Sequence, residues 1–149
     1  MSCHEDLKSS FEKIHEKAKG NPNEEELKRY FYKAGILERL GYRDKDIRLE
    51  KGIKGKRTDI HCLDDFKNVV LVIEFKKPSV KNLKDHFDQL WELYVKPLKA
   101  EYGILINGLE LILYERINSN YERVLRANLS DISKKDCRKL CSLLTKPVY

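Results

Sequence analysis

The sequence contains no hydrophobic run long enough to cross a membrane and no sign of an export signal. A transmembrane helix needs about 20 consecutive apolar residues, and no segment of the 149-residue chain approaches that length. The N-terminal stretch Met1–Asp6 is charged and lacks the apolar centre of a signal peptide. We therefore expect no membrane association and a cytoplasmic location.

Cysteine is sparse, and its spacing matches no metal or redox motif. None of the four cysteines, Cys3, Cys62, Cys137 and Cys141, belongs to a Cys-x-x-Cys pair. No histidine pair lies near the last two to complete a zinc site. The sequence therefore predicts reduced thiols without a metal or a disulfide.

Motifs for nucleotide-driven motion and for methyl transfer are also missing. The chain has no Gly-x-x-x-x-Gly-Lys-Ser/Thr loop, so it carries no P-loop motor ATPase. The basic stretch Gly52–Arg57 contains two glycines but is too short and ends differently. No recognisable methyltransferase motif and no internal repeat is present.

Charge, in contrast, is plentiful. Lysine and arginine number 30 against 24 aspartates and glutamates, which gives a net charge of +6. This excess favours a polyanionic partner such as nucleic acid, although an ordinary solvated surface explains it equally well. With 41% hydrophobic residues, a chain of this length can bury a core and form one domain.

Apolar periodicity predicts an α/β fold, with a mixed sheet of about five strands flanked by helices. Helical spacing predicts helices over residues 3–19, 24–40, 80–96 and 131–145, the last one capped by Ser130. Alternating or continuous apolar runs predict strands near 47–53, at 58–63, 69–76, 102–106 and 109–115, and near 121–126. We divide the single domain 1–149 into an N-terminal helix (1–20), a core (21–126) and a C-terminal helix (127–149).

The predicted strand that begins at Val69 ends in an unusual way. Five aliphatic residues, Val69–Ile73, are followed by Glu74, an aromatic residue and Lys76. Because strand side chains alternate, Glu74 and Lys76 point to the same face, about 7 Å apart along the strand. A charged pair at the end of a buried strand is either a local ion pair or part of a functional site.

The preceding strand supplies a partner for Glu74. In a hairpin whose centre lies in the polar loop Asp64–Asn68, Asp59 stands directly opposite Glu74. A slip of one residue would move the two carboxylates to opposite faces. Like charges at opposed positions destabilise a sheet unless they are neutralised, and Mg²⁺ binds one or two carboxylates together with waters and phosphate oxygens. Two carboxylates that bind Mg²⁺, with the ammonium of Lys76 beside them, suit phosphodiester hydrolysis.

These residues resemble the PD-(D/E)xK nuclease superfamily, although Thr58 stands where the family has proline. A longer region, about residues 24–115, resembles the N-terminal nuclease domain of type I restriction enzyme motor (R) subunits and related fused restriction enzymes. The segments that carry this resemblance are Leu37–Tyr42, Asp46–Asp59, Ile73–Pro78, Tyr102–Gly108 and Leu113–Tyr114.

The resemblance implies a metal-dependent endodeoxyribonuclease domain of a restriction-modification system. Its cofactor would be Mg²⁺ or Mn²⁺, held by Asp59, Glu74 and the backbone carbonyl of Phe75. Lys76 would activate or position the attacking water. The candidate partners are DNA and helicase, methyltransferase or specificity domains absent from this chain. A catalytically idle nucleic-acid-binding or interaction module on the same fold remains an alternative.

The family also suggests further site residues. Gln89 matches a glutamine on the helix after the lysine, and Tyr94 follows it by five residues where the family usually has four. An acidic residue on the first core helix often reaches the metal. Glu25 is the best match, with Glu24 and Glu26 as rivals.

Basic residues that flank the proposed site are candidates for DNA binding, and each is equally an ordinary surface residue. They are Lys54, Lys56, Arg57, Lys77 and Lys81. His61 alternates to the same face as Asp59, and we interpret it as a packing residue or as a neighbour of the site.

Overall fold

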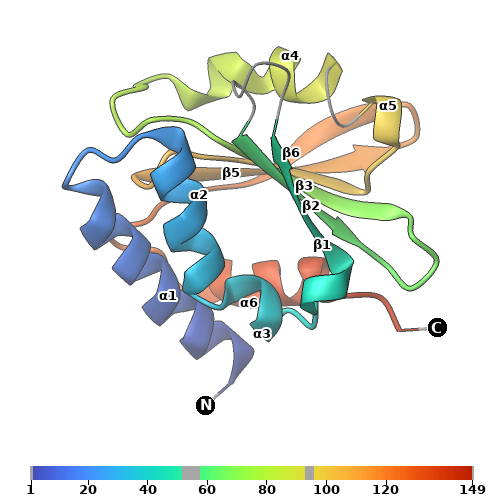
Figure 1. Ribbon diagram of the computed structural model, residues 1–149, viewed down its shortest axis with the longest axis horizontal. Helices are drawn as coiled ribbons and strands as arrows, with labels where there is room; N and C mark the ends of the chain where they lie inside the picture. Colours follow the sequence, from blue (N-terminus) through green and yellow to red (C-terminus); the bar gives the residue numbers. More distant parts are fainter. Residues whose placement is uncertain (1, 52–57, 93–95, 149) are drawn as a thin grey trace.

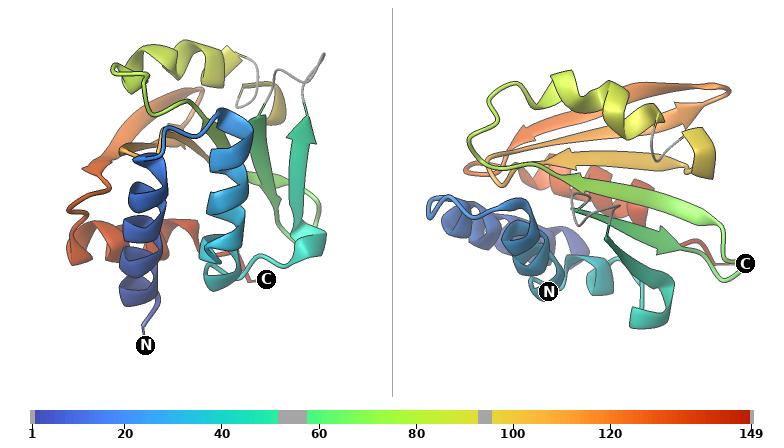
Figure 2. Two further views of the ribbon diagram at one scale, coloured as in Figure 1. Left: turned by 60° about the vertical axis from the view of Figure 1, so that its left-hand side comes forward. Right: turned by 45° about the horizontal axis from the view of Figure 1, so that its top comes forward.

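A six-stranded sheet runs through the centre of the molecule, with helices on both of its faces (Figure 1, Figure 2). The computed structural model describes residues 2–51, 58–92 and 96–148. The strands lie side by side in chain order, β1 to β6. Every neighbouring pair is antiparallel except β3 and β4, which are parallel. The predicted α/β class and mixed sheet are confirmed, with six strands rather than about five.

The strand bounds follow the predicted apolar runs closely. They are β1 Ile47–Lys51, β2 Thr58–Leu63, β3 Val69–Phe75, β4 Tyr102–Ile106, β5 Glu110–Ile117 and β6 Asn120–Asn128. The strands β2 and β4 have the predicted ends, whereas β5 and β6 extend further. The basic turn at 52–57 lies outside the described residues.

The β2–β3 hairpin has the predicted register. Asp59 stands opposite Glu74, and the pairing shifts only beyond Cys62, at the far end from these two carboxylates. Asp64 shapes the hairpin loop, because its Oδ1 accepts hydrogen bonds from the backbone N–H groups of Phe66 and Asn68, both at 2.9 Å. The pairing next to the loop, Leu63 opposite Val69, differs by one residue from the pairing at the carboxylates, so the shift between Cys62 and Leu63 brings Asp59 opposite Glu74.

One face of the sheet carries most of the helices and the larger apolar core. Those helices are α1 Cys3–Ala18, α2 Glu24–Lys33, α3 Ile36–Arg39 and α6 Lys134–Leu144. Leu7, Phe11 and Ile14 of α1 are buried there together with Ile73 of β3 and Leu140 of α6. Among the described residues, no helix is long and apolar enough to cross a membrane.

The helix predicted over residues 24–40 is wrong in its continuity, because it is divided at Gly35. Gly35 has φ +79°, a left-handed conformation that glycine adopts at little cost, and it separates α2 from α3. The start of α2 is as predicted: Asn23 Oδ1 accepts from the N–H of Glu26 at 2.8 Å, and the Glu26 carboxylate accepts from the N–H of Asn23 at 3.2 Å.

The opposite face is covered by the crossover from β3 to β4. The continuous helix predicted over 80–96 is also wrong: the chain forms a 3-10 turn, η3 Leu83–His86, then α4 Phe87–Leu90 and later α5 Lys96–Leu98. Asn82 has a non-helical conformation, and the N–H of Asp85 bonds to its carbonyl at 3.0 Å, so a tight turn replaces the first predicted helical turns. Leu83 and Leu90 are buried against this face of the sheet. The predicted site residue Tyr94 lies outside the described residues.

The last helix begins later than predicted. The strand β6 runs to Asn128, and Leu129 and Ile132 are buried in the connection that follows. The cap of α6 is therefore Ser133, whose Oγ accepts from the N–H of Asp136 at 3.0 Å, and not Ser130.

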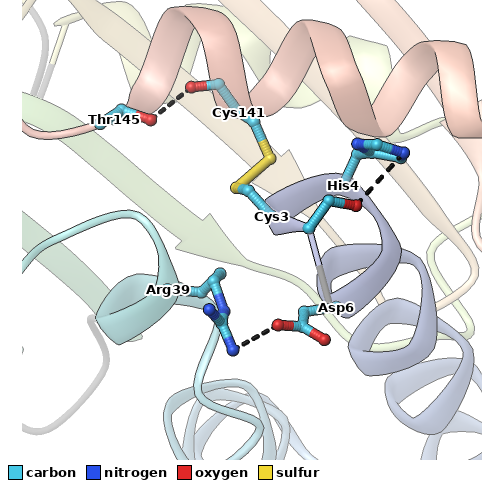
Figure 3. Close-up of a disulfide and its surroundings, with 7 residues drawn as sticks. Cys3, His4, Asp6, Arg39, Cys141 and Thr145 are labelled. Atoms are coloured by element: carbon cyan, nitrogen blue, oxygen red, sulfur yellow. Dashed lines mark hydrogen bonds and ion pairs between the residues drawn. A yellow bond between two sulfur atoms is a disulfide. The ribbon is translucent and has the colours of Figure 1, made fainter.

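The prediction of four reduced thiols is wrong for one pair. Cys3, at the start of α1, forms a disulfide with Cys141 of α6 (Figure 3). Their Cα atoms are 6.3 Å apart although 138 positions separate them in the sequence. The pairing depends on α1 and α6 lying side by side, and the spacing of cysteines in the sequence does not predict that packing. Cys62 and Cys137 are buried free thiols.

Loss of this disulfide is expected to lower the free energy of unfolding by about 3–5 kcal/mol, because the bond restricts a very long loop of the unfolded chain. Cys3→Ser and Cys141→Ser should each show this loss in urea denaturation without reductant, and the double variant should lose no more than either single one. In dithiothreitol the wild type should become as unstable as the variants. A wild type that is unaffected by reductant would contradict the expectation.

Candidate active site

The centre of the candidate site is a pair of buried carboxylates on neighbouring strands. Asp59 of β2 and Glu74 of β3 are 0% and 3% exposed, and they are directly opposed in the sheet. Within the described part of the chain, neither oxygen of Asp59 and not Oε2 of Glu74 accepts a hydrogen bond. Buried carboxylates without donors are costly, so this pair has lone pairs available for a cation.

The electrostatic state of Glu74 reflects this crowding. The pKa of Glu74 is raised from 4.5 to about 7, and burial is the largest cause. The ammonium of Lys76 lowers this pKa, while the charges of Asp59 and Glu24 act in the same direction as burial. Without a cation, Glu74 therefore carries a proton for part of the time near neutral pH.

Lys76 lies against the pair and is held from a second element. Its Nζ is 3.6 Å from Oε1 of Glu74 and donates a hydrogen bond to Oε1 of Gln89 at 2.9 Å. Gln89 comes from α4, on the crossover that passes over this face of the sheet (Figure 1). The structure thus brings together Asp59, Glu74, Lys76 and Gln89, as the sequence predicted.

The glutamates at the start of α2 have three different surroundings. Glu25, the preferred candidate from the sequence, forms an ion pair with the buried Lys28 at 3.1 Å. Glu26 belongs to the helix cap. Glu24 is the one whose charge acts on Glu74. Among the three, Glu24 is therefore the glutamate that influences the carboxylate pair electrostatically. The sequence does not distinguish them, because adjacent helix residues differ in direction by about 100°.

The structure places His61 beside Asp59, in agreement with one of the two interpretations that the sequence left open. His61 is buried, and its Nε2 lies 2.5 Å from Oδ2 of Asp59, an ion-pair distance although Oδ2 accepts no aligned hydrogen bond. The signal that pointed to it was strand alternation, which places His61 and Asp59 on one face.

The other predicted residues have mixed outcomes. Lys77 and Lys81 are exposed just beyond β3, where a phosphate could reach them. Lys54, Lys56 and Arg57 lie outside the described residues. The ring of Phe75 packs edge-on against Phe31 of α2, with centroids 5.4 Å apart, so this aromatic side chain belongs to the core.

The site provides two carboxylates and no larger ligand cluster. In the ranges that the structure describes, no group of three or more His, Cys, Asp or Glu side chains is arranged to hold a metal ion. Mg²⁺ binds through one or two protein carboxylates and completes its shell with waters and phosphates. The unbonded oxygens of Asp59 and Glu74 fit that mode of binding.

Comparison with known families decides the relationship. Residues 23–129 match the model of the type I restriction enzyme R protein N terminus. The chain belongs to this family. The matched region begins at the cap of α2 and ends just after β6, so it contains the candidate site of this R protein N-terminal domain. The resemblance inferred from the sequence is confirmed.

A solved structure shares the fold. A chain in the cryoEM structure of a DrdV–DNA complex superimposes with a TM-score of 0.63 at 18% sequence identity. The match covers 93% of this R protein N-terminal domain but only 13% of that chain. No curated protein matches the sequence.

The raised pKa of Glu74 predicts a pH-dependent stability in the metal-free protein. Between pH 5 and 8 the native state binds more protons at Glu74 than the unfolded state, so the free energy of unfolding should fall as the pH rises. In EDTA, Glu74→Gln should remove this contribution. Between pH 5 and pH 8, the free energy of unfolding of the variant should therefore rise by about 2 kcal/mol relative to that of the wild type. Denaturation curves at both pH values measure it.

Glu16→Gln is a matched control, because Glu16 is an exposed glutamate on α1 paired with Lys19. It should leave the pH dependence of the wild type unchanged. Parallel pH profiles for wild type and Glu74→Gln would contradict the assignment of a buried, ionising Glu74.

Proposed function

We propose that this domain is a Mg²⁺- or Mn²⁺-dependent endonuclease of the PD-(D/E)xK type, which hydrolyses phosphodiester bonds in DNA within a restriction-modification system. The observation that carries the proposal is the buried pair of Asp59 and Glu74, with Lys76 held beside it by Gln89. Membership of the type I restriction enzyme R protein N-terminal family supports it.

The metal would be held by Asp59, Glu74 and the backbone carbonyl of Phe75. When bound, a divalent ion supplies polarisation of the phosphoryl oxygen and a lowered pKa for the attacking water. The chain itself contributes a buried site in which two carboxylates are fixed by adjacent strands, so their positions need little reorganisation.

Lys76 would act on the attacking water and on the charge that develops at the phosphate. Its ammonium has three N–H donors, and the structure commits one of them to Gln89. The ammonium also lies 3.6 Å from Oε1 of Glu74, which leaves one donor for a water or a phosphate oxygen. Because the contacts to Gln89 and Glu74 restrict the side chain, the ammonium is oriented before substrate arrives. Gln89 thereby serves as a positioning residue for Lys76.

DNA is the substrate that the surroundings support. Lys77 and Lys81 are exposed directly beyond the strand that carries Glu74, and lysines at such places contact phosphates without reading the sequence. Lys54, Lys56 and Arg57 are further candidates for DNA binding from the sequence alone. The DNA complex of the DrdV structure agrees with this substrate class. Helicase, methyltransferase or specificity functions would come from other domains or subunits.

Lys76→Ala should abolish most of the cleavage activity and Lys77→Ala should not. The wild type should relax supercoiled plasmid with Mg²⁺ or Mn²⁺, and EDTA should stop the reaction. Removing the charge at Lys76 should lower the cleavage rate by about 100-fold or more, because it acts at the transition state. The neighbouring Lys77→Ala should lose only a few-fold through weaker DNA binding. Gel assays of supercoiled, nicked and linear DNA measure these rates.

Equal cleavage rates for wild type and Lys76→Ala would show that Lys76 is not part of the chemistry. A wild type that binds Mn²⁺ in calorimetry but cuts no DNA would favour the alternative, an idle binding module or a domain that needs its missing partners.

The two glutamates Glu24 and Glu25 offer a second test of the site. Glu24→Gln should weaken Mn²⁺ binding about 10-fold, because the charge of Glu24 acts on Glu74, and partners of metal-binding carboxylates commonly contribute effects of this size. Glu25→Gln, one residue along the same turn, should leave the affinity within about two-fold. Isothermal titration of Mn²⁺ into each variant measures this difference. The opposite ranking would restore Glu25 as the acidic residue of the site.

A further inference from the structure

His61 is a buried polar side chain in β2 to which the proposed chemistry assigns no task. It lies on the sheet face of Asp59, and its cross-strand neighbours are Arg48 of β1 and Val72 of β3. The residues on either side of it in β2, Ile60 and Cys62, are fully buried and apolar on the other face. An imidazole at a buried strand position costs desolvation energy that an aliphatic residue would avoid. Its polar contact therefore calls for an explanation.

That contact is with the candidate metal ligand. Nε2 of His61 lies 2.5 Å from Oδ2 of Asp59, and both side chains are buried. Neither oxygen of Asp59 accepts a hydrogen bond from the described residues, and the χ2 torsion of an aspartate has only a broad preference of its own. Among the described residues, the imidazole of His61 is therefore the group whose contact can orient the Asp59 carboxylate.

We propose that His61 is a positioning residue for the metal site, which fixes the Asp59 carboxylate through Oδ2 and leaves Oδ1 as the ligand atom. The inference rests on the proposed function. Ligating carboxylates are commonly oriented by a hydrogen-bonding partner behind them, and removing such a partner weakens metal binding 10–100-fold.

The test compares variants of His61 that differ in the reach of one polar group. The amide nitrogen of Gln occupies about the place of the imidazole Nε2, whereas the amide of Asn is one methylene too short. His61→Gln should bind Mn²⁺ within about three-fold of wild type. His61→Asn and His61→Leu should bind it 10–100-fold more weakly. Isothermal titration of MnCl₂ into the full chain gives the dissociation constants, independently of cleavage.

His86→Leu serves as the matched control, because His86 lies on η3 and is not one of the groups whose charge acts on Glu74. It should bind Mn²⁺ with wild-type affinity. Thermal melts in EDTA identify variants that do not fold. The Gln and Asn comparison keeps the test decisive if the Leu variant unfolds, because both amides are polar.

Two results would overturn the inference. One is wild-type Mn²⁺ affinity in folded His61→Asn. The other is an equal loss for folded Gln and Asn variants, which would mean that a polar group reaching Oδ2 of Asp59 is not what maintains the metal affinity. Either result leaves the proposed nuclease standing, since Mn²⁺ still binds to the wild type. A wild type that fails to bind Mn²⁺ at all defeats the proposed function and this inference together.

Discussion

The register of one hairpin determines whether this domain has a site at all. In the β2–β3 pairing, Asp59 is directly opposite Glu74. Strand alternation places both carboxylates on the face of Val72, which belongs to the same apolar cluster as Leu90 of α4. A slip of one residue would place one of these carboxylates in the opposite core, among Leu71, Ile73 and Phe75. The aliphatic residues that alternate with Asp59 and Glu74 along the two strands therefore also fix the register of the site. The same burial that stabilises the hairpin raises the pKa of Glu74 and makes a cation a favourable partner.

Much of this arrangement was predictable because it depends on local sequence. The alternation along Val69–Lys76 identifies the shared face of Glu74 and Lys76. Centring the hairpin on the polar loop predicts the pairing of Asp59 with Glu74, but not the shift between Cys62 and Leu63. The helices were harder. The break at Gly35 and the 3-10 turn at Leu83–His86 depend on how these segments meet the sheet, and apolar spacing continues through both of them. Helical periodicity reports which side is buried but not where the helix is interrupted.

The residues that could not be ranked from sequence are those whose roles depend on distances between elements. Glu24, Glu25 and Glu26 are equivalent in a sequence, but the charge of Glu24 acts on Glu74, Glu25 pairs with a buried lysine and Glu26 caps the helix. Strand alternation places His61 on the same face as Asp59, but only the structure shows that the two side chains are in contact. The cysteines gave the least information, because Cys3 and Cys141 meet through the packing of the first and last helices.

That disulfide changes the topology of the molecule as well as its stability. Bonded through Cys3 and Cys141, the backbone is a closed ring with two short tails, and every strand and both carboxylates belong to the ring. A single break of the peptide chain anywhere within the ring yields two fragments that stay in one covalent molecule. A nicked domain would keep β2 and β3 tethered, so the parts of the site could find one another again without diffusing apart.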